Sequence, residues 1–184
     1  TRVTEGTTTI YVTVEVSSSI LLLPEVPMTG RLDNPRVGYF TNPLTNFSDG
    51  QQRVNKKQFI TRWRLEPRPE DRAAYLRGEL VEPRKPIVFY IENSTPYRWR
   101  KYIKQGIEDW QVAFERAGFK NAIIAKDITE DMEVDMDDVN YSVLTYAAST
   151  KANAMGPSIL DPRSGEILEA DIMWWHNVLS MLQE

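Results

Sequence analysis

The strongest constraint on the fold is an amphipathic helix that the sequence predicts between Pro96 and Ala117. Thr95 is a candidate N-cap, Pro96 suits the first helical position, and Gly118 suits the C′ position, where helices often enter the left-handed region. Large apolar side chains recur every three or four residues and form one stripe: Trp99, Ile103, Ile107, Trp110, Phe114 and Ala117. A stripe of this length indicates that one face of the helix packs on a sheet.

The segments on both sides of this helix are expected to be strands of one sheet. Ile87–Ile91 is a short apolar run of the kind that is buried in parallel or mixed sheets, and Asn121–Lys126 follows the helix. Strands that flank a helix of this length are expected to be parallel neighbours joined by a right-handed crossover. Three more strands are expected after them: Tyr141–Ala148, Asn153–Leu160 and Glu166–Met173.

The last two of these strands are predicted to form an antiparallel hairpin, because only the turn Asp161–Gly165 separates them. The resulting order is β-α-β-β-β-β. It predicts an α+β protein with a mixed, mostly parallel sheet, one long helix and one antiparallel edge strand.

The N-terminal part of the sequence is predicted to be mostly β. Apolar and polar residues alternate from Thr7 to Val16, which is typical of a half-buried strand. Two further strand-like runs, Arg36–Thr41 and Gln58–Leu65, are separated by Pro, Asn, Gly and Asp residues that favour turns.

A charged, Pro-rich run from Pro67 to Pro86 separates this part from the helix and its strands. It holds one short predicted helix around Asp71–Arg77. We therefore expect a β-rich N-terminal region over residues 1–85 and a second region over residues 86–184.

Composition argues against several classes of function. Lys and Arg number 22 against 26 Asp and Glu, and the net charge of −4 does not favour a nucleic-acid partner. The absence of Cys excludes disulfides, thiolate metal sites and cysteine nucleophiles. The longest aliphatic run, Ile20–Leu23, is far too short to cross a membrane, so no membrane segment is expected in this chain.

The sequence contains no recognisable catalytic or metal-binding motif: no Walker loop, no dinucleotide fingerprint and no HExxH. The only histidine, His176, stands beside Trp174 and Trp175. We expect it to be packed or exposed rather than to bind metal, because a catalytic zinc takes about three protein ligands. No catalytic residue, metal ligand or cofactor is therefore predicted in this chain.

Acidic residues are concentrated between Asp127 and Asp138, and two interpretations are open. Their alternation resembles a calcium-binding loop in four positions: Asp131, Glu133, Asp135 and Asp137. An EF-hand loop, however, needs Gly at its sixth position and a bidentate Glu at its twelfth, and both are absent. A solvated loop is the favoured interpretation, and weak calcium binding is the alternative.

The tryptophans also allow two interpretations, a sugar-stacking surface or a packed core. Core packing is favoured for Trp99 and Trp110, which belong to the helix stripe, and for Trp63, which belongs to an alternating strand. Trp174 and Trp175 are adjacent and cannot both face one core, so one of them is a candidate for a contact surface.

A small, uncharged segment in the last third of the sequence is predicted to form the edge of the sheet. It ends in Gly-Pro, and Pro cannot donate a hydrogen bond to a central ladder. An exposed edge can pair with an extended peptide or with a second copy of the chain, although a blunted edge without a ligand explains the composition equally well. The candidate substrate-binding residues are Ala152, Asn153, Ala154, Met155, Gly156 and Pro157.

The predicted order of elements resembles that of the upper subdomain of metzincin zinc peptidases, which precedes the zinc-binding helix. That order is strand, long helix, strand, strand, edge strand, strand. A family of large zinc-dependent metallopeptidases from Bacteroidetes is similar in two segments, KPIVFYIENSTPYRWRKYIKQGIEDWQVAFERAGFKNAIIAKD (Lys85–Asp127) and DPRSGEILEADIMWWHNV (Asp161–Val178). The runs RVGYFT and FITRWRLEP are similar to the β region that such proteins carry ahead of the peptidase domain. The resemblance extends over nearly the whole chain.

The resemblance implies a zinc site of the form HExxHxxGxxH further along a parent polypeptide, where the His residues bind zinc and the Glu activates water. No position of that motif falls within residues 1–184, so zinc is expected only in the full-length parent. By position, residues 152–157 would be the strand that lines the cleft and pairs antiparallel with substrate. Glu166–Met173 would be the inner strand that leads toward the zinc helix. Only Ser149–Lys151 separates two strands that several metzincin branches join by a long metal-binding connection, so no structural zinc is expected.

The resulting hypothesis is a non-catalytic part of a zinc-dependent metallo-endopeptidase, inactive by itself, that contributes the scaffold and the substrate-cleft edge strand. The parent is expected to be exported, to the periplasm, the outer-membrane surface or the medium, and to act on peptides or proteins. The alternative is a non-enzymatic adhesion or glycan-binding module of a secreted bacterial protein. A zinc motif encoded downstream of Glu184 would favour the peptidase, and an early stop codon would favour the module.

Overall fold

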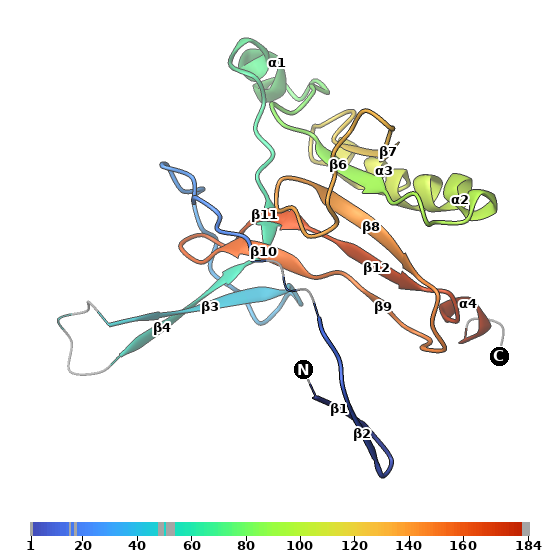
Figure 1. Ribbon diagram of the computed structural model, residues 1–184. Coiled ribbons are helices and arrows are strands. Elements are labelled where there is room, and N and C mark those ends of the chain that lie inside the picture. Colours follow the sequence, from blue (N-terminus) through green and yellow to red (C-terminus); the bar gives the residue numbers. More distant parts are fainter. Residues whose placement is uncertain (1, 15, 17, 48–49, 51–53, 182–184) are drawn as a thin grey trace.

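The computed structural model describes residues 2–14, 16, 18–47, 50 and 54–181. Its largest sheet has five strands (Figure 1), in the order β7 (Ile123–Asp127), β6 (Ile87–Ile91), β8 (Ser142–Ala147), β12 (Ile172–Trp175) and β9 (Ala154–Met155). The first four are mutually parallel, and β9 pairs antiparallel with β12 at the edge. The predicted mixed, mostly parallel sheet with one antiparallel edge strand is therefore confirmed, and the chain is α+β.

The helix predicted between Pro96 and Ala117 is present as two shorter helices, α2 (Tyr97–Glu108) and α3 (Gln111–Arg116). The prediction of one continuous helix is wrong at Trp110, whose N–H donates to Ile107 O, three residues back, and tightens the turn. The Trp110 side chain is 66% exposed, so its assignment to the buried stripe is also wrong. A tighter turn rotates the later residues away from the line that the earlier ones follow.

The two ends of this helical segment were predicted with different success. Pro96, not Thr95, occupies the N-cap position, and the Thr95 side chain is buried without forming a cap hydrogen bond. At the other end Gly118 has a φ of 92°, as expected for a C′ glycine. The Phe119 N–H donates to Phe114 O over 2.9 Å, which is the long hydrogen bond of a Schellman motif.

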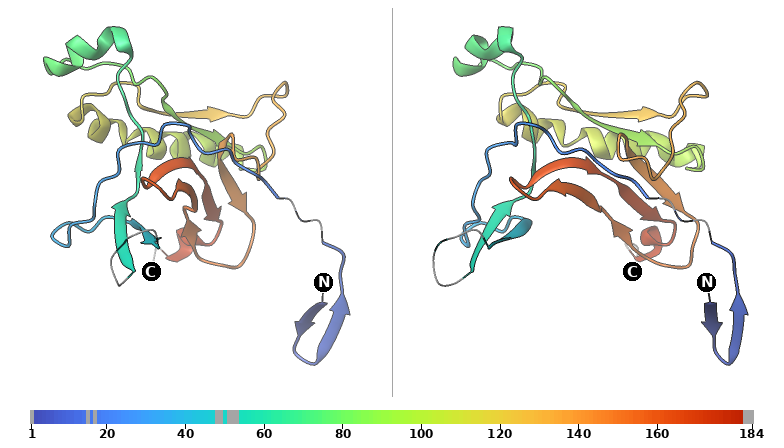
Figure 2. Two further views of the ribbon diagram at one scale, coloured as in Figure 1. Left: turned by 90° about the vertical axis from the view of Figure 1, so that its left-hand side faces the viewer. Right: turned by 60° about the vertical axis from the view of Figure 1, so that its left-hand side comes forward.

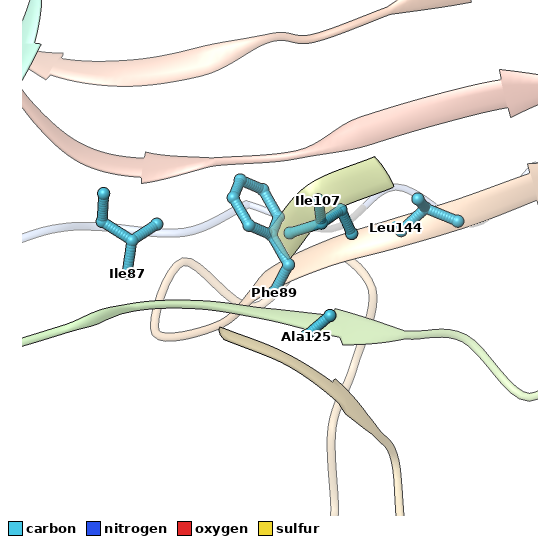
Figure 3. Packing of buried hydrophobic residues seen from close by; sticks show 5 residues of the cluster. All are labelled: Ile87, Phe89, Ile107, Ala125 and Leu144. Atoms are coloured by element: carbon cyan, nitrogen blue, oxygen red, sulfur yellow. The ribbon is translucent and has the colours of Figure 1, made fainter. Parts of the chain in front are cut away.

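The helices pack on one face of the central sheet and bury an apolar core (Figure 3). Its buried members come from one helix and three strands: Ile87, Phe89, Ile107, Ala125 and Leu144. Trp63 and Leu65, from outside the central sheet, pack against the same cluster. The core therefore contains residues from both of the regions expected on either side of residue 85.

A second, three-stranded sheet extends the hairpin that carries the edge strand. It contains β10 (Ser158–Asp161), β11 (Glu166–Ala170) and β5 (Arg62–Trp63), in that order. Along the chain, β9 leads into β10 and β11 leads into β12, so two sheets share one long hairpin. The antiparallel hairpin expected from the turn Asp161–Gly165 is confirmed. The single strands expected over Asn153–Leu160 and Glu166–Met173 are wrong, because each range is divided between the two sheets.

The turn of this hairpin is fixed by a buried carboxylate and a glycine. Arg163 Nη2 donates to Asp161 Oδ2 over 2.7 Å, and such hydrogen bonds from Arg163 lower the pKa of Asp161 although its burial acts in the opposite direction. Gly165 has a φ of 75°, and a Cβ at this position would lie 2.5 Å from Ile60 O. Only glycine fits there.

The strands of the N-terminal region lie partly outside the predicted ranges. β1 (Arg2–Glu5) and β2 (Thr8–Tyr11) form a hairpin that projects away from the rest of the chain (Figures 1 and 2). The half-buried strand expected over Thr7–Val16 is wrong, because the strand of the described residues is Thr8–Tyr11 and all four of its residues are exposed. A two-stranded hairpin has no second layer that could bury its apolar side chains. Glu15, assigned to the polar face of that strand, lies outside the described residues.

A second hairpin joins β3 (Thr41–Asn46) to β4 (Asn55–Ile60). The strand expected over Arg36–Thr41 begins only at its last residue, so that prediction is wrong. The run expected as one strand over Gln58–Leu65 is divided between β4 and β5, because the chain changes its pairing partner between Ile60 and Arg62.

Three arginine side chains hold an extended segment from Pro24 to Thr29. One comes from β5, one from the residue that follows Trp63, and one from the hairpin turn. Their guanidinium groups donate to backbone oxygens over 2.7 to 3.0 Å: Arg163 to Pro24, Arg64 to Val26 and Arg62 to Thr29. The Arg62 and Arg64 bonds attach this segment to the β5 part of the chain, and the Arg163 bond attaches it to the turn of the hairpin that carries the edge strand.

The remaining helical elements are short. The 3₁₀ turn Pro69–Asp71 leads into α1 (Arg72–Leu76), which confirms the helix expected around Asp71–Arg77, and α4 (Val178–Met181) follows β12. Within the described part of the chain, no helix has the length and apolar character needed to span a membrane.

Candidate functional site

The candidate site is the free edge of the long hairpin, formed by β9 and continued by β10. β9 lies beside β12 (Figure 1), with Met155 opposite Met173 and Ala154 opposite Trp174. On its other side, no strand of the described ranges pairs with β9, and β10 is likewise the outer strand of its own sheet. A free edge therefore extends from Asn153 to Asp161.

The hydrogen bonds toward β12 show which backbone groups of this edge point outward. Trp175 N–H donates to Asn153 O over 3.2 Å, and Asp171 N–H donates to Pro157 O over 3.0 Å. Because inward and outward groups alternate along an antiparallel strand, the intervening even-numbered residues, Ala154 and Gly156, direct their N–H and C=O outward. These are the groups that a further strand would pair with.

The outward amide of Ala154 already has a local partner. The Asn153 side chain accepts a hydrogen bond from Ala154 N–H through Oδ1, over 2.9 Å. An added strand would have to displace this exposed side chain. The Asn153 side chain thus accepts the hydrogen bond from Ala154 N–H when no partner strand is present.

The six predicted site residues have different roles in this edge. Ala154 and Met155 form β9, while Ala152 and Asn153 precede it and Gly156 and Pro157 connect it to β10; all six are exposed. Ala154 and Met155 therefore lie at the edge of the central sheet, and the role of all six residues in substrate binding stays a prediction. The Pro, expected to mark an edge, stands where the hairpin passes from one sheet to the other.

Aromatic side chains lie beside β9 on the helix-bearing side of the sheet. Trp174 makes an edge contact with Trp99 of α2, with ring centroids 6.3 Å apart, and a tilted contact with Tyr146 of β8. Tyr146 Oη lies 2.5 Å from His176 Nδ1, so the only histidine is packed, as expected. Trp175 points to the opposite face and is buried, which agrees with the prediction that Trp174 and Trp175 cannot share one core.

The acidic stretch Asp127–Asp138 is mostly committed to local contacts. Asp127 forms ion pairs with Lys104 and Arg100 of α2. Asp135 Oδ1 accepts a hydrogen bond from Asp137 N–H, as turn-forming carboxylates do. Nowhere in the described ranges do three or more His, Cys, Asp or Glu side chains come together in a way that could hold a metal ion.

A pair of carboxyl groups near the edge was not foreseen from the sequence. Glu169 of β11 is only 6% exposed, and Asp171 follows it at the junction of β11 with β12. Burial, and then the hydrogen bond and the negative charge of Asp171, raise the pKa of Glu169 to about 8. A signal was available in the sequence: Glu169 and Asp171, two residues apart, both fall within Glu166–Met173, a range predicted to be an inner strand.

An apolar groove lies between the helices and the sheet. Its volume is about 540 Å³, and it extends from Trp63 past Phe89 and Ile107 to Trp174, with the exposed Trp110 at its rim. The helices leave this part of the sheet face open. Nothing in the described contacts identifies what covers it.

Comparison with known proteins gives one match. A family model described as a domain of unknown function, DUF5117, matches residues 1–68, which include the first two hairpins, the segment Pro24–Thr29 and β5. No curated protein and no solved structure matches the chain.

Proposed function

We propose that this chain supplies the substrate-binding edge and part of the scaffold of an exported zinc-dependent metallo-endopeptidase. The observation that carries the proposal is the free edge of β9 and β10, with the backbone groups of Ala154 and Gly156 directed outward. Extended peptides commonly bind to such edges by adding a strand. The outer, antiparallel position of β9 fits the role that the metzincin resemblance implies for residues 152–157. Of the range Glu166–Met173, to which the resemblance assigns the inner strand, only the last two residues belong to β12, which lies inside the central sheet.

In this proposal the chain binds and orients the peptide. A peptide lying antiparallel to β9 would accept a hydrogen bond from Ala154 N–H and donate one to Ala154 O, with a second pair at Gly156. Asn153 would release the Ala154 amide as the peptide binds. The scissile bond would thereby be held at a fixed position along the strand, which lowers the entropic part of the activation barrier for hydrolysis.

The zinc site would be supplied by the rest of the parent polypeptide. Residues 1–184 contain one His and no Cys, and that His is packed against Tyr146. A bound zinc would polarise the peptide carbonyl and activate a water molecule. A first test is the reading frame beyond Glu184, where the proposal requires an HExxH motif.

The substitution Ala154→Pro in the full-length parent tests the role of the edge. It removes an outward amide donor and leaves in place the two hydrogen bonds that flank β9 on its inner side, because their acceptors are Asn153 O and Pro157 O. Loss of one hydrogen bond to substrate is expected to lower kcat/KM by about 3- to 10-fold. Ala154→Gly keeps the N–H and is the matched control.

Zinc content should be the same in both variants, because the metal ligands would lie elsewhere. Unchanged kcat/KM in Ala154→Pro, with Ala154→Gly also unchanged, would contradict a substrate-binding role for β9.

The alternative is a non-enzymatic adhesion or glycan-binding module. It is favoured by large apolar side chains that the N-terminal region exposes, among them Tyr11 (84%), Phe40 (90%) and Phe47 (80%). Such a module would bind its ligand through these exposed side chains. A glycan array probed with the 184-residue chain separates the two proposals, because specific glycan binding that is lost on Phe40→Ala is expected only of the module.

A further inference from the structure

A small acidic cavity opens beside the free edge, immediately after β9. Its volume is about 210 Å³, and its walls come from the loop Met136–Val139, from Pro157–Ile159 and from Glu169 and Asp171. The loop residues include Asp137 and Asp138. Four carboxyl groups therefore line this cavity, and no Lys, Arg or His does.

The carboxyl group of Glu169 is buried without a positive partner. Its Oε1 is inaccessible to solvent and has no hydrogen-bond partner within the described part of the chain. Neither Glu169 nor Asp171 takes part in an ion pair among the described residues. A buried carboxyl group in this state is costly unless a proton or a cation neutralises it.

The groups around Glu169 are all acidic or neutral. Asp171 faces it and uses Oδ1 to accept a hydrogen bond from Val143 N–H over 2.8 Å. Asp138 Oδ1 accepts hydrogen bonds from Asn140, and Asp137 contributes a further charge to the cavity wall. The electrostatic potential inside the cavity therefore favours a cation.

The shape of the site favours an organic cation over a metal ion. Ca²⁺ requires about six to eight oxygen ligands, and no group of three acidic side chains is placed to hold a metal ion in the described ranges. A cavity of about 210 Å³ is much larger than a bare ion and accepts an ammonium or guanidinium group on an alkyl stem. These groups present several N–H donors, which is what an unpaired carboxylate oxygen lacks.

From these observations we infer that Glu169 and Asp171 form the floor of a subsite for a Lys or Arg side chain of a peptide bound along β9 and β10. The inference rests on the proposed function for the position of the peptide. From Ala154 to Ser158 an extended chain covers about 13 Å. The basic residue would therefore stand three to five positions from the peptide residue that pairs with Ala154.

Binding of the cation is coupled to loss of a proton from the acid pair. Glu169 must be ionised to form the ion pair, and its pKa is raised to about 8 by burial and by Asp171. Affinity for the basic side chain should therefore rise with pH between about pH 6 and pH 8. A neutral side chain at the same position should bind with no such pH dependence.

The test uses the 184-residue chain and two fluorescein-labelled peptides, each with a Thr-Val repeat and one variable position. That position holds Arg in one peptide and citrulline, its neutral isostere, in the other. Fluorescence anisotropy at pH 8 is expected to give about tenfold tighter binding for the Arg peptide. Glu169→Gln should remove this difference and leave the affinity of the citrulline peptide unchanged.

Each outcome has a separate meaning. Equal affinity of the two peptides for the unsubstituted chain would overturn the subsite but leave the peptide-binding edge. Binding of neither peptide would overturn the edge itself and the subsite with it. An Arg preference that Glu169→Gln does not change would overturn the assignment to this cavity.

A second probe reports on the cavity without the edge. Ethylguanidinium is expected to shift the backbone amide NMR signals of residues 169–171 in the unsubstituted chain and in Ala154→Pro, but not in Glu169→Gln. If Ca²⁺ shifts these signals and ethylguanidinium does not, the cavity is a metal site and the inference is wrong.

Discussion

Replacement of Glu169 by Gln should change how the stability of the chain depends on pH. The carboxyl group has an ordinary pKa of 4.5 and a folded-state pKa of about 8, raised by burial and by Asp171. Between these two values the folded chain holds a proton that the unfolded chain has lost. The stability contributed by the protonated group is therefore fully present below about pH 4.5 and is lost as pH rises through 8.

The size of the effect follows from the same two values. A difference of about 3.5 units, from 8 minus 4.5, corresponds to at most about 5 kcal/mol. Sharing of the proton with Asp171 and local relaxation reduce this ceiling, and a loss of about 2–4 kcal/mol between pH 5 and pH 9 is expected. Gln fills nearly the same volume and carries no charge, so Glu169→Gln should remove most of the loss.

Urea unfolding followed by tryptophan fluorescence at pH 5, 6, 7, 8 and 9 measures this difference. The free energy of unfolding of the unsubstituted chain should fall relative to Glu169→Gln as pH rises, and the two should converge near pH 5. Asp137→Asn, in the wall of the same cavity, is the matched control and should keep the steep dependence. Parallel curves for the unsubstituted chain and Glu169→Gln would refute the buried acid pair.

Two further predictions concern the helices and the metal. Trp110→Ala should lower the free energy of unfolding in urea by no more than about 1 kcal/mol, because the Trp110 side chain is 66% exposed. Ile107→Ala should lower it by about 2–5 kcal/mol, because Ile107 is buried in the core. Equal losses would mean that both side chains are packed. The purified chain should retain no stoichiometric zinc after dialysis and should not cleave casein, since it has one His and no Cys; chelator-sensitive cleavage would overturn this prediction.

Local patterns predicted the parts of the fold that depend on local physics. The apolar run Ile87–Ile91, the left-handed Gly118 and the turn Asp161–Gly165 are present where the sequence placed them. Each depends on a preference within a few residues, such as the freedom of glycine at positive φ. Alternation at Thr7–Val16 failed, because a strand pattern does not specify whether a second layer exists to bury it.

The stripe at Trp110 failed for a related reason. A spacing of three or four residues is compatible with an α-helix and with an α-helix interrupted by a tighter turn, and only tertiary contacts decide between them. Trp110 stands at that turn and its side chain lies at the rim of the apolar groove. Sequence periodicity predicted the existence of the helices but not the exposure of this side chain.

The edge and the acidic cavity have a common structural origin at Asp171, where the hairpin leaves one sheet and joins the other. Its N–H donates to Pro157 O, which holds the outer strand, and its Oδ1 accepts a hydrogen bond from Val143 N–H of β8. Substitution of Asp171 would therefore disturb the edge, the sheet and the cavity together, and a loss of peptide binding would not identify the cause. Glu169 makes neither of these two bonds. Glu169→Gln consequently separates the chemistry of the subsite from the geometry of the edge, and it is the substitution on which both the pH prediction and the proposed recognition of a basic residue depend.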